Sequence, residues 1–439
     1  MMGKRLLVLL LIVLKEAGPT AAQTCSSRCS STSCTCSNMG LTSVPQDLPT
    51  TITRLDLENN SISILSQADF SRYESLYYLH LHRNQISIIN NGTFQDLSNL
   101  TFLALRDNQL ANLHANAFVG LSNLYALYLD NNQVSSLPAD IFVGLGNLDT
   151  LRLHNNQLNS LPADVFEGLG NLTFLSLNDN QLSSLPAGIF EGLGNLGGLD
   201  LSNNQLNSLP AGIFEGLGNL WWLDLNDNQL SSLPAGIFEG LGNLWWLDLN
   251  DNQLSSLPAG IFEGLGILEF LFLNDNQLSS LPADTFTVLA ALINLQAISN
   301  NPWQCDCNML PFKELMTGSH VFEYLIICAG PANLTGLSLL YDVTPEDMIC
   351  VETTKAPSTL RTSTPASTPN LAASCSSESD RIFWKKCIAK QFWKKASCRK
   401  RCRKCRKKCS KCSKKFRKVC PDQATRPNTC LQKFREKCS

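Results

Sequence analysis

The chain has 439 residues, of which 44% are hydrophobic, and its 35 Lys and Arg nearly balance its 37 Asp and Glu. This length and composition allow a large buried core. After the N-terminal segment, no apolar run approaches the roughly 20 residues that span a bilayer. The C-terminus also lacks the hydrophobic tail of a lipid-anchor signal. We therefore expect neither a transmembrane segment nor a lipid anchor.

The near-neutral total hides two segments of opposite charge. From Cys375 onward the chain carries 23 Lys and Arg against 4 Asp and Glu, about +19. Everything before Cys375 then holds 12 basic and 33 acidic residues, about −21. The two parts of the chain are therefore expected to have different partners.

The segment 1–22 reads as a signal peptide. Lys4 and Arg5 precede an apolar run, Leu6 to Leu14, and small residues lead up to Gln23. The 18 cysteines fall into groups of 4, 4 and 10, which suits disulfides in an oxidising compartment. Five Asn-x-Ser/Thr sites fit a secretory route as predicted glycosylation sites: Asn59, Asn91, Asn99, Asn171 and Asn333. The predicted localisation is secreted and extracellular.

The segment 51–300 is built from one regular repeat, LxxLxLxxN. Its second leucine recurs at a constant interval, at Leu55, Leu79, Leu103, Leu127, Leu151, Leu175, Leu199, Leu223, Leu247 and Leu271. A degenerate eleventh copy ends at Asn301-Pro302. Alternating leucines predict one short strand per turn, with eleven strands stacked into a parallel sheet about 50 Å long. The repeat asparagine can satisfy backbone groups where the strand turns away, and one Phe per repeat fills the other side.

A one-dimensional stack exposes its core at both ends and therefore needs caps. Four cysteines lie in residues 23–50, at Cys25, Cys29, Cys34 and Cys36. Four more lie in residues 301–352, at Cys305, Cys307, Cys328 and Cys350. We predict disulfide-bonded caps in both places.

The outward strand positions vary while the repeat frame stays fixed, which is typical of a binding surface. The predicted ligand-binding residues are Tyr125, Tyr128, Trp222, Asp224, Trp246, Asp248, Phe270 and Phe272. In each Trp-Trp pair we expect the second tryptophan to point outward and the first to pack on its neighbour. An exposed aromatic ladder favours a binding role. Passive copying is the alternative, because Leu217–Gly240 and Leu241–Gly264 are identical.

Asp200, Asp224 and Asp248 occupy one position on three successive strands. Carboxylates about 5 Å apart raise one another's pKa unless a cation compensates. Three interpretations stay open: a basic ligand, bound Ca²⁺, or a solvated acidic surface.

No sequence motif indicates an enzyme. The chain has no GxSxG, no HExxH and no phosphate-cradling glycine loop. His80 and His82 are too few for zinc, which takes three or four convergent ligands. We predict no catalytic residues, no metal and no cofactor.

The C-terminal segments differ in composition from the repeats. Residues 353–374 hold ten Ser or Thr and three Pro, which predicts a disordered, O-glycosylated stalk. Residues 375–439 form a basic tail with cysteines at helical spacing: Cys398, Cys402, Cys405, Cys409 and Cys412. Such a stripe needs opposing cysteines from the same tail or from another chain. A disulfide-linked homo-oligomer, binding to anionic surfaces, and charge pairing with the acidic repeats all remain open.

The repeats and their cysteine-rich flanks resemble extracellular leucine-rich-repeat proteins, such as Slit-like proteins, small proteoglycans and, most closely, variable lymphocyte receptors and related invertebrate proteins. The turns reading LPAGIFEGLGNL look like the LPxGxF units of those receptors. The resemblance implies an α/β solenoid, a curved horseshoe with a parallel concave sheet. It also implies disulfides Cys305–Cys328 and Cys307–Cys350. The N-terminal spacing departs from the family's usual C-x3-C-x-C-x6-C, which leaves that pairing open.

Our leading hypothesis is a secreted recognition protein whose concave face binds a microbial polysaccharide or lipid surface, with the tail oligomerising the chain. The resemblance supplies the immune part of this hypothesis. The alternatives are an adhesion or matrix protein that binds an extracellular protein, or a carrier of a cationic antimicrobial tail. A nucleic-acid partner is not expected to be physiological, because the chain is predicted to be secreted.

Overall fold

The computed structural model describes residues 24–282, 285, 298–316 and 326–349. All of them belong to the first of the two units into which the chain divides, Met1–Thr353. The predicted signal peptide (1–22), the predicted stalk (353–374), the predicted tail (375–439) and Cys350 lie outside the described residues.

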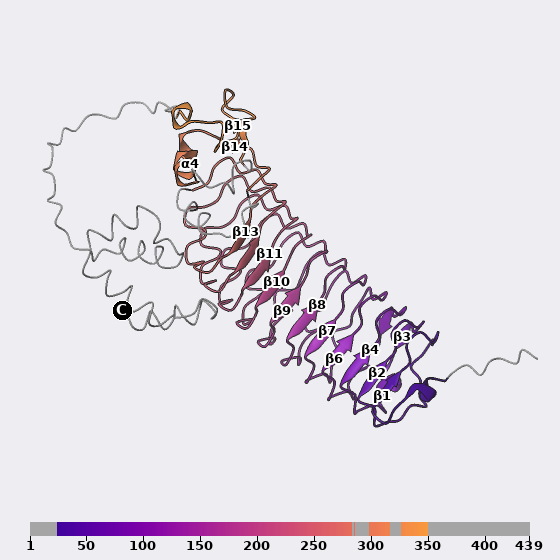
Figure 1. Cartoon of the computed structure of the whole chain (residues 1–439). Coiled ribbons are helices and arrows are strands. Elements are labelled where there is room, and N and C mark those ends of the chain that lie inside the picture. The colour runs from indigo at the N-terminus through magenta and orange to yellow at the C-terminus, as the bar shows by residue number, and fades with distance from the viewer. Residues whose placement is uncertain (1–23, 283–284, 286–297, 317–325, 350–439) are drawn as a thin grey trace, which may run out of the picture. The chain divides into compact units, whose positions relative to one another are not determined.

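The core of the fold is one parallel sheet of eleven short strands, stacked side by side (Figure 1). Its strands are β1 (Ser33–Thr35), β2 (Arg54–Asp56), β4 (Tyr78–His80), β6 (Phe102–Ala104), β7 (Ala126–Tyr128), β8 (Thr150–Arg152), β9 (Phe174–Ser176), β10 (Gly198–Asp200), β11 (Trp222–Asp224), β12 (Trp246–Asp248) and β13 (Phe270–Phe272). Two smaller parallel pairs join β3 (Ile64–Leu65) to β5 (Ile88–Ile89) and β14 (Trp303–Gln304) to β15 (Cys328–Gly330). The predicted parallel solenoid is confirmed.

The register of the sheet follows the sequence period without a shift. Leu199 pairs with Leu223, and Leu223 pairs with Leu247, so the central leucines form one buried column. The sheet also contains a strand that was not predicted, β1 of the N-terminal flank, which pairs with β2. The strand predicted for the degenerate repeat falls mostly outside the described residues.

The repeat asparagines form a buried ladder. In Asn204, Nδ2 donates to the carbonyl oxygens of Leu177 (3.0 Å) and Leu201 (3.1 Å), while Oδ1 accepts from the backbone N–H of Leu182 (3.0 Å). Leu177 and Leu182 belong to the preceding repeat. Each asparagine therefore satisfies the backbone of two repeats at once, in a place where a buried unpaired group is costly.

The residue before each ladder asparagine is in the left-handed region. Asn203 has φ of 50° and Asp227 has φ of 49°, and the same holds at the equivalent position of the other described repeats. Asn and Asp adopt this conformation more readily than other non-glycine residues. This explains why the sequence reads Asn-Asn or Asp-Asn at that point in nearly every repeat.

The opposite side of the solenoid is held by a column of phenylalanines. From Phe94 to Phe262, successive rings are stacked at centroid distances of 6.3 to 6.4 Å. Turns rather than helices build most of this side, and each of the six units between Pro138 and Gly266 contains one Pro and two or three Gly. Gly188 and Gly192, for example, have φ of 75° and 81°. Among the described residues the α-helices are α2 (Gln67–Phe70) and α4 (Leu310–Met316).

Disulfides lie at both ends of the repeats. Near the N-terminus, beside the 3-10 helix η1 (Cys25–Arg28), Cys25 pairs with Cys36 and Cys29 with Cys34. At the other end, which contains η2 (Cys307–Met309) and η3 (Pro345–Asp347), Cys305 pairs with Cys328 as the resemblance implied. Cys307 is also disulfide-bonded, but its expected partner Cys350 lies outside the described residues.

The ladder predicts a large cost for losing one amide. In Asn228, Nδ2 donates to three carbonyl oxygens and Oδ1 accepts from Leu206 N–H. Asn228→Ala should lower the free energy of unfolding by at least about 2 kcal/mol, because it leaves these buried groups unpaired. Urea unfolding followed by circular dichroism measures the change. Gln229→Ala, at the exposed neighbouring position, is the control, and equal midpoints for the two variants would contradict the assignment.

Candidate ligand-binding surface

The side chains that point away from the core form four rows across the strands, which we call the outer sheet face. The entry row precedes each strand and reads Tyr77, Thr101, Tyr125, Asp149, Thr173, Gly197, Trp221, Trp245, Glu269. The first strand row reads Tyr78, Phe102, Ala126, Thr150, Phe174, Gly198, Trp222, Trp246, Phe270. The second strand row reads His80, Ala104, Tyr128, Arg152, Ser176, Asp200, Asp224, Asp248, Phe272. The exit row follows each strand and reads His82, Arg106, Asp130, His154, Asn178, Ser202, Asn226, Asn250, Asn274.

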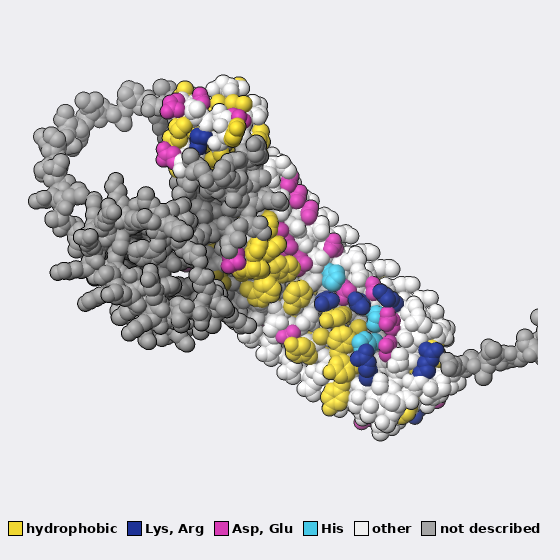
Figure 2. All heavy atoms as spheres, in the orientation of Figure 1, with side chains coloured by type: hydrophobic (Ala, Val, Ile, Leu, Met, Phe, Trp, Pro, Cys, Tyr) yellow, Lys and Arg dark blue, Asp and Glu magenta, His cyan; other side chains and the backbone are white. Residues whose placement is uncertain are grey.

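Apolar side chains gather on the C-terminal half of this face (Figure 2). We call the following residues the aromatic patch: Trp221, Trp222, Trp245, Trp246, Phe270 and Phe272. Within it, the Trp246 ring lies 5.0 Å from the Phe270 ring and 4.8 Å from the Phe272 ring, between centroids. Trp245 meets Phe270 edge-on at 4.6 Å. The rings of Trp245, Trp246, Phe270 and Phe272 therefore form one cluster, and Trp222 is the strand neighbour of Trp246 beside it.

The exposure within the first tryptophan pair differs from the expectation. Trp221, the first of its pair, is 50% exposed, whereas Trp222 and Trp246 are half-buried. Trp246 is partly covered by its two phenylalanine neighbours, and its buried indole N–H has no hydrogen-bond partner. Trp222 leans across β10 to lie parallel to Phe174, with centroids 6.1 Å apart. The spacing of the residues in the sequence does not predict this packing of rings across neighbouring strands.

Two glycines make the lateral packing possible. A Cβ atom added to Gly198 would lie 2.8 Å from the Phe174 ring and 3.4 Å from the Trp222 ring. A Cβ on Gly197 would lie 2.8 Å from Trp221 Nε1. Because Gly197 and Gly198 have no side chains, the rings of Phe174, Trp221 and Trp222 can occupy the space above them. The two glycines mark the N-terminal border of the aromatic patch.

The three predicted aspartates line up beside the patch. Asp200 pairs with Asp224 and Asp224 with Asp248 in the register of the sheet. Their Oδ1 atoms accept from the backbone N–H two residues later, at 3.1, 3.1 and 3.0 Å. Burial raises the pKa of Asp224 to about 7 and that of Asp248 to about 6. Repulsion between neighbouring carboxylates contributes less than burial, and Asp248 is buried, so a solvated acidic surface does not describe this column.

The N-terminal half of the face carries charged and polar side chains beside exposed tyrosines. Arg152 Cζ lies 4.3 Å from the centre of the Tyr128 ring, a cation–π contact. Tyr125 is 56% exposed and hydrogen-bonds to the Asp149 carboxylate, which raises the pKa of the tyrosine. β7, which carries Tyr128, is four strand spacings from β11, about 19 Å. The eight predicted binding residues therefore fall into two separate areas of the face.

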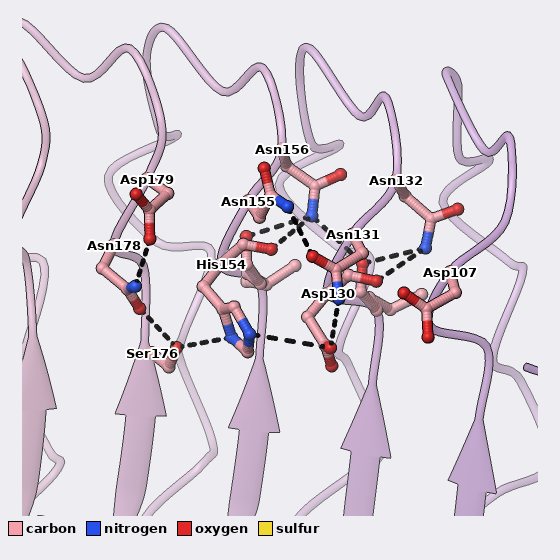
Figure 3. Close-up of polar contacts among 12 residues, drawn as sticks. Asp107, Asp130, Asn131, Asn132, His154, Asn155, Asn156, Ser176, Asn178 and Asp179 are labelled. Atoms are coloured by element: carbon pink, nitrogen blue, oxygen red, sulfur yellow. Dashed lines mark hydrogen bonds and ion pairs between the residues drawn. The ribbon is translucent and has the colours of Figure 1, made fainter.

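A polar chain that the sequence did not predict links three repeats (Figure 3). Ser176 Oγ lies 2.9 Å from His154 Nδ1, and His154 Nε2 lies 3.6 Å from Asp130 Oδ2. Asp130 is 2% exposed, its Oδ1 has no partner, and burial raises its pKa against the opposing effect of His154. A sequence signal existed, because Asp130 and His154 are one repeat apart and so share a row.

The proton positions in this chain argue against a serine nucleophile. Ser176 Oγ also lies 2.8 Å from Asn178 Oδ1, which can only accept. The one serine proton is therefore held by Asn178, and His154 must donate to the serine rather than take its proton. Activation of a serine requires the reverse polarity. These hydrogen bonds and the ion pair fix the orientation of His154 and Asp130, and such fixed polar side chains suit a binding surface.

Metal-ligating side chains do not converge in the described part of the chain in groups of three or more. His82 is buried and lies 3.1 Å from Glu58 Oε1 through Nε2, so it pairs with a carboxylate. None of the helices described has the length and apolar character needed to cross a bilayer.

The glycine border gives the first prediction for this face. Gly198→Ala should displace the Phe174 and Trp222 rings, because the new methyl group would overlap Phe174. We expect a shift in tryptophan emission with little loss of stability, since the displaced groups are surface side chains. Gly218→Ala, whose Cβ would meet open space, should leave the emission unchanged. Identical emission spectra from the two variants would refute the packing described.

The buried carboxyls predict a specific pH dependence. The folded pKa values of Asp224 and Asp248, about 7 and about 6, exceed the unfolded value near 4. Below pH 4 both carboxyls are protonated in the folded and the unfolded state. The wild type loses stability as pH rises from about 4 to about 7, because the unfolded state releases these protons first. The stability of Asp224→Asn/Asp248→Asn relative to the wild type should therefore increase by about 4 kcal/mol from pH 5 to pH 8.

Chemical denaturation at the two pH values measures this difference. Asp140→Asn/Asp164→Asn removes the same charge from exposed positions and is the matched control. If both double variants changed equally with pH relative to the wild type, burial of Asp224 and Asp248 would not be the cause.

Comparisons with known proteins agree with this architecture. The profile of the leucine rich repeat family matches overlapping stretches at residues 50–110, 74–134, 122–182, 171–230, 199–254, 223–278 and 243–301. The comparison with curated proteins finds no match.

Three similar solved structures illustrate the fold. A leucine-rich repeat protein of Leptospira interrogans is 27% identical with a TM-score of 0.51, over 62% of this chain and 74% of that one. A chain of the Drosophila Toll–Spatzle complex is 30% identical with a TM-score of 0.53, over 58% of this chain but 34% of that one. A chain of the octameric complex of Latrophilin 3, Unc5D and FLRT2 is 26% identical with a TM-score of 0.54, over 71% and 95%. Because the family profile covers more than half of its residues, the chain belongs to the leucine-rich repeat family.

Proposed function

We propose that this chain is a secreted recognition protein of the kind that its resemblance to variable lymphocyte receptors implies. Its outer sheet face binds the ligand, and the favoured ligand is a microbial polysaccharide or lipid surface. The observation that carries the proposal is the aromatic patch on β11, β12 and β13, which includes the 50% exposed Trp221. A fold gains nothing from leaving such rings in water, so a partner that covers them is the simplest explanation.

The chemistry of the patch suits a ligand with apolar surfaces and a few polar groups. Tryptophan and tyrosine dominate binding energy in many interfaces because each ring buries a large area with little loss of rotamer freedom. Asp224 and Asp248, once ionised, offer acceptors at the edge of the same surface.

A second candidate is an adhesion protein that binds an extracellular protein. Two similar structures are complexes with protein partners, Toll with Spatzle and Latrophilin 3 with Unc5D and FLRT2. The Toll–Spatzle complex is described as a hub in development and innate immunity, which supports a recognition role as well. The disulfides at both ends of the repeats fit an extracellular setting for either candidate.

The basic tail supplies a separate part of the proposal. Residues 375–439 carry about +19 and ten cysteines, and we propose that they link several copies of the chain through disulfides. Several weak sites on one assembly then bind a repetitive surface with higher avidity than one site does. The same charge gives the tail a salt-sensitive attraction to anionic surfaces.

Binding of the full-length protein tests the proposal. Trp222→Ala/Trp246→Ala should lower affinity for a microbial polysaccharide or lipid preparation at physiological salt by about 10- to 100-fold, because it removes two central anchors. Surface plasmon resonance against purified preparations and against extracellular host proteins measures the loss. Val119→Ala/Val143→Ala, at exposed apolar positions outside the outer sheet face, is the control.

The outcomes separate the candidates. Loss of microbial binding in the tryptophan variant alone supports recognition by the outer sheet face. Loss of binding only to a host protein supports the adhesion candidate. Binding that survives the tryptophan substitutions and disappears in high salt belongs to the tail and overturns the proposed role of the patch.

A further inference from the structure

A groove of about 930 Å³ lies on the N-terminal half of the face, beside the entry row. Its walls hold the rings of Tyr77, Tyr78, Phe102 and Tyr125 together with the side chains of Thr101 and Asp149. Four asparagines complete the lining: Asn99, Asn123, Asn147 and Asn171. The groove therefore combines exposed aromatic rings with a regular row of amides.

These asparagines belong to a second ladder, at the surface. Asn99 Nδ2 donates to the Glu74 carbonyl oxygen (3.1 Å), and Asn171 Nδ2 donates to that of Gly146 (2.8 Å). The same bond recurs at Asn123, Asn147, Asn195, Asn219 and Asn243, each reaching a carbonyl of the preceding repeat. An amide nitrogen carries two hydrogens. One is committed to the ladder, and the other has no role in the fold.

Two of these ladder asparagines begin Asn-x-Thr motifs, the predicted sites of N-glycosylation. Asn99 and Asn171 each begin Asn-Leu-Thr, whereas the residue two positions after Asn123 is Tyr125 and that after Asn147 is Asp149. The third position of the motif is always the entry-row residue, so that residue determines whether the motif is complete; it is Thr101 after Asn99 and Thr173 after Asn171. The row that forms the outer sheet face thus also selects which ladder asparagines can carry a glycan.

The surroundings of the two acceptors differ. In the entry row, Thr101 lies between Tyr77 and Tyr125, which are 44% and 56% exposed. Thr173 lies between Asp149 and Gly197, and the Trp221 indole leans over Gly197. The apolar face of a sugar packs well on an aromatic ring, so Asn99, with an exposed tyrosine on each side of its threonine, has a larger aromatic cradle than Asn171, which lines the same groove.

We propose that an N-linked glycan on Asn99 lies in this groove against Tyr77 and Tyr125, and so closes the groove to other ligands. The inference rests on the secretion that the proposed function includes. A lipid-linked oligosaccharide pyrophosphate donates the sugar: its anomeric carbon bonds to Asn99 Nδ2, the bond to the pyrophosphate oxygen breaks, and one Nδ2 proton leaves. The remaining N–H still donates to the Glu74 carbonyl oxygen, so glycosylation leaves this hydrogen bond of the surface ladder in place. Ligands are then directed to the aromatic patch.

Site-specific removal of the glycans tests the proposal on the full-length protein made in secretory cells. An amidase that releases N-glycans from native protein should act at Asn99 at least 10-fold more slowly than at Asn171, by peptide mass spectrometry. Tyr77→Ala/Tyr125→Ala should bring the two rates within about twofold by speeding release at Asn99 alone. Tyr341→Ala, at an exposed site beyond the repeats, should change neither rate.

Each other result counts against the inference. Equal release rates in the wild type, or a slow rate at Asn99 that the tyrosine substitutions leave unchanged, would overturn the docking of the glycan. If Asn333 carried a glycan and Asn99 did not, this inference alone would be overturned, because the chain would then have entered the glycosylating pathway. If Asn99, Asn171 and Asn333 were all empty, both the inference and the proposed secretion would fail.

Discussion

The buried asparagine ladder is the constraint on which the rest of the structure depends. A strand of three residues cannot satisfy its own flanking backbone groups, and the chain must turn away from the sheet at every repeat. In each repeat one amide closes that gap, as Asn204 does by joining Leu201 of its own repeat to Leu177 and Leu182 of the preceding one. Each repeat is therefore stabilised by its neighbours, and a single repeat would not form its strand alone.

Because the ladder and the leucine and phenylalanine columns fulfil the needs of the fold, the outward rows are free to differ. The chain uses that freedom unevenly along its length. The N-terminal half carries exposed tyrosines together with charged and polar groups around Asp130, His154 and Arg152, and the aromatic patch occupies β11 to β13. Gly197 and Gly198 separate them and give the rings of Phe174, Trp221 and Trp222 room to lean inward.

Burial, more than charge repulsion, sets the electrostatics of this face. Asp130, Asp224 and Asp248 all have raised pKa values, and the largest cause in each case is loss of water around the carboxyl group. Large neighbouring side chains on adjacent strands produce that loss. The rings of the aromatic patch therefore accompany a change in the protonation of the acids beside them near neutral pH.

The sequence by itself determined the period, the strand positions, the leucine and phenylalanine columns and the ladder asparagines, because in a stacked repeat the register follows from the constant spacing of the copies. The family resemblance gave the Cys305–Cys328 disulfide. Only the tertiary structure decided that Trp221 is more exposed than Trp222, that Asp248 is buried, and that Ser176, His154 and Asp130 form one chain. It also showed that β1 of the N-terminal flank joins the sheet. A period fixes which residues are neighbours, whereas exposure and hydrogen bonding depend on how far each side chain leans across the neighbouring strands, and that depends on the volumes packed beside it.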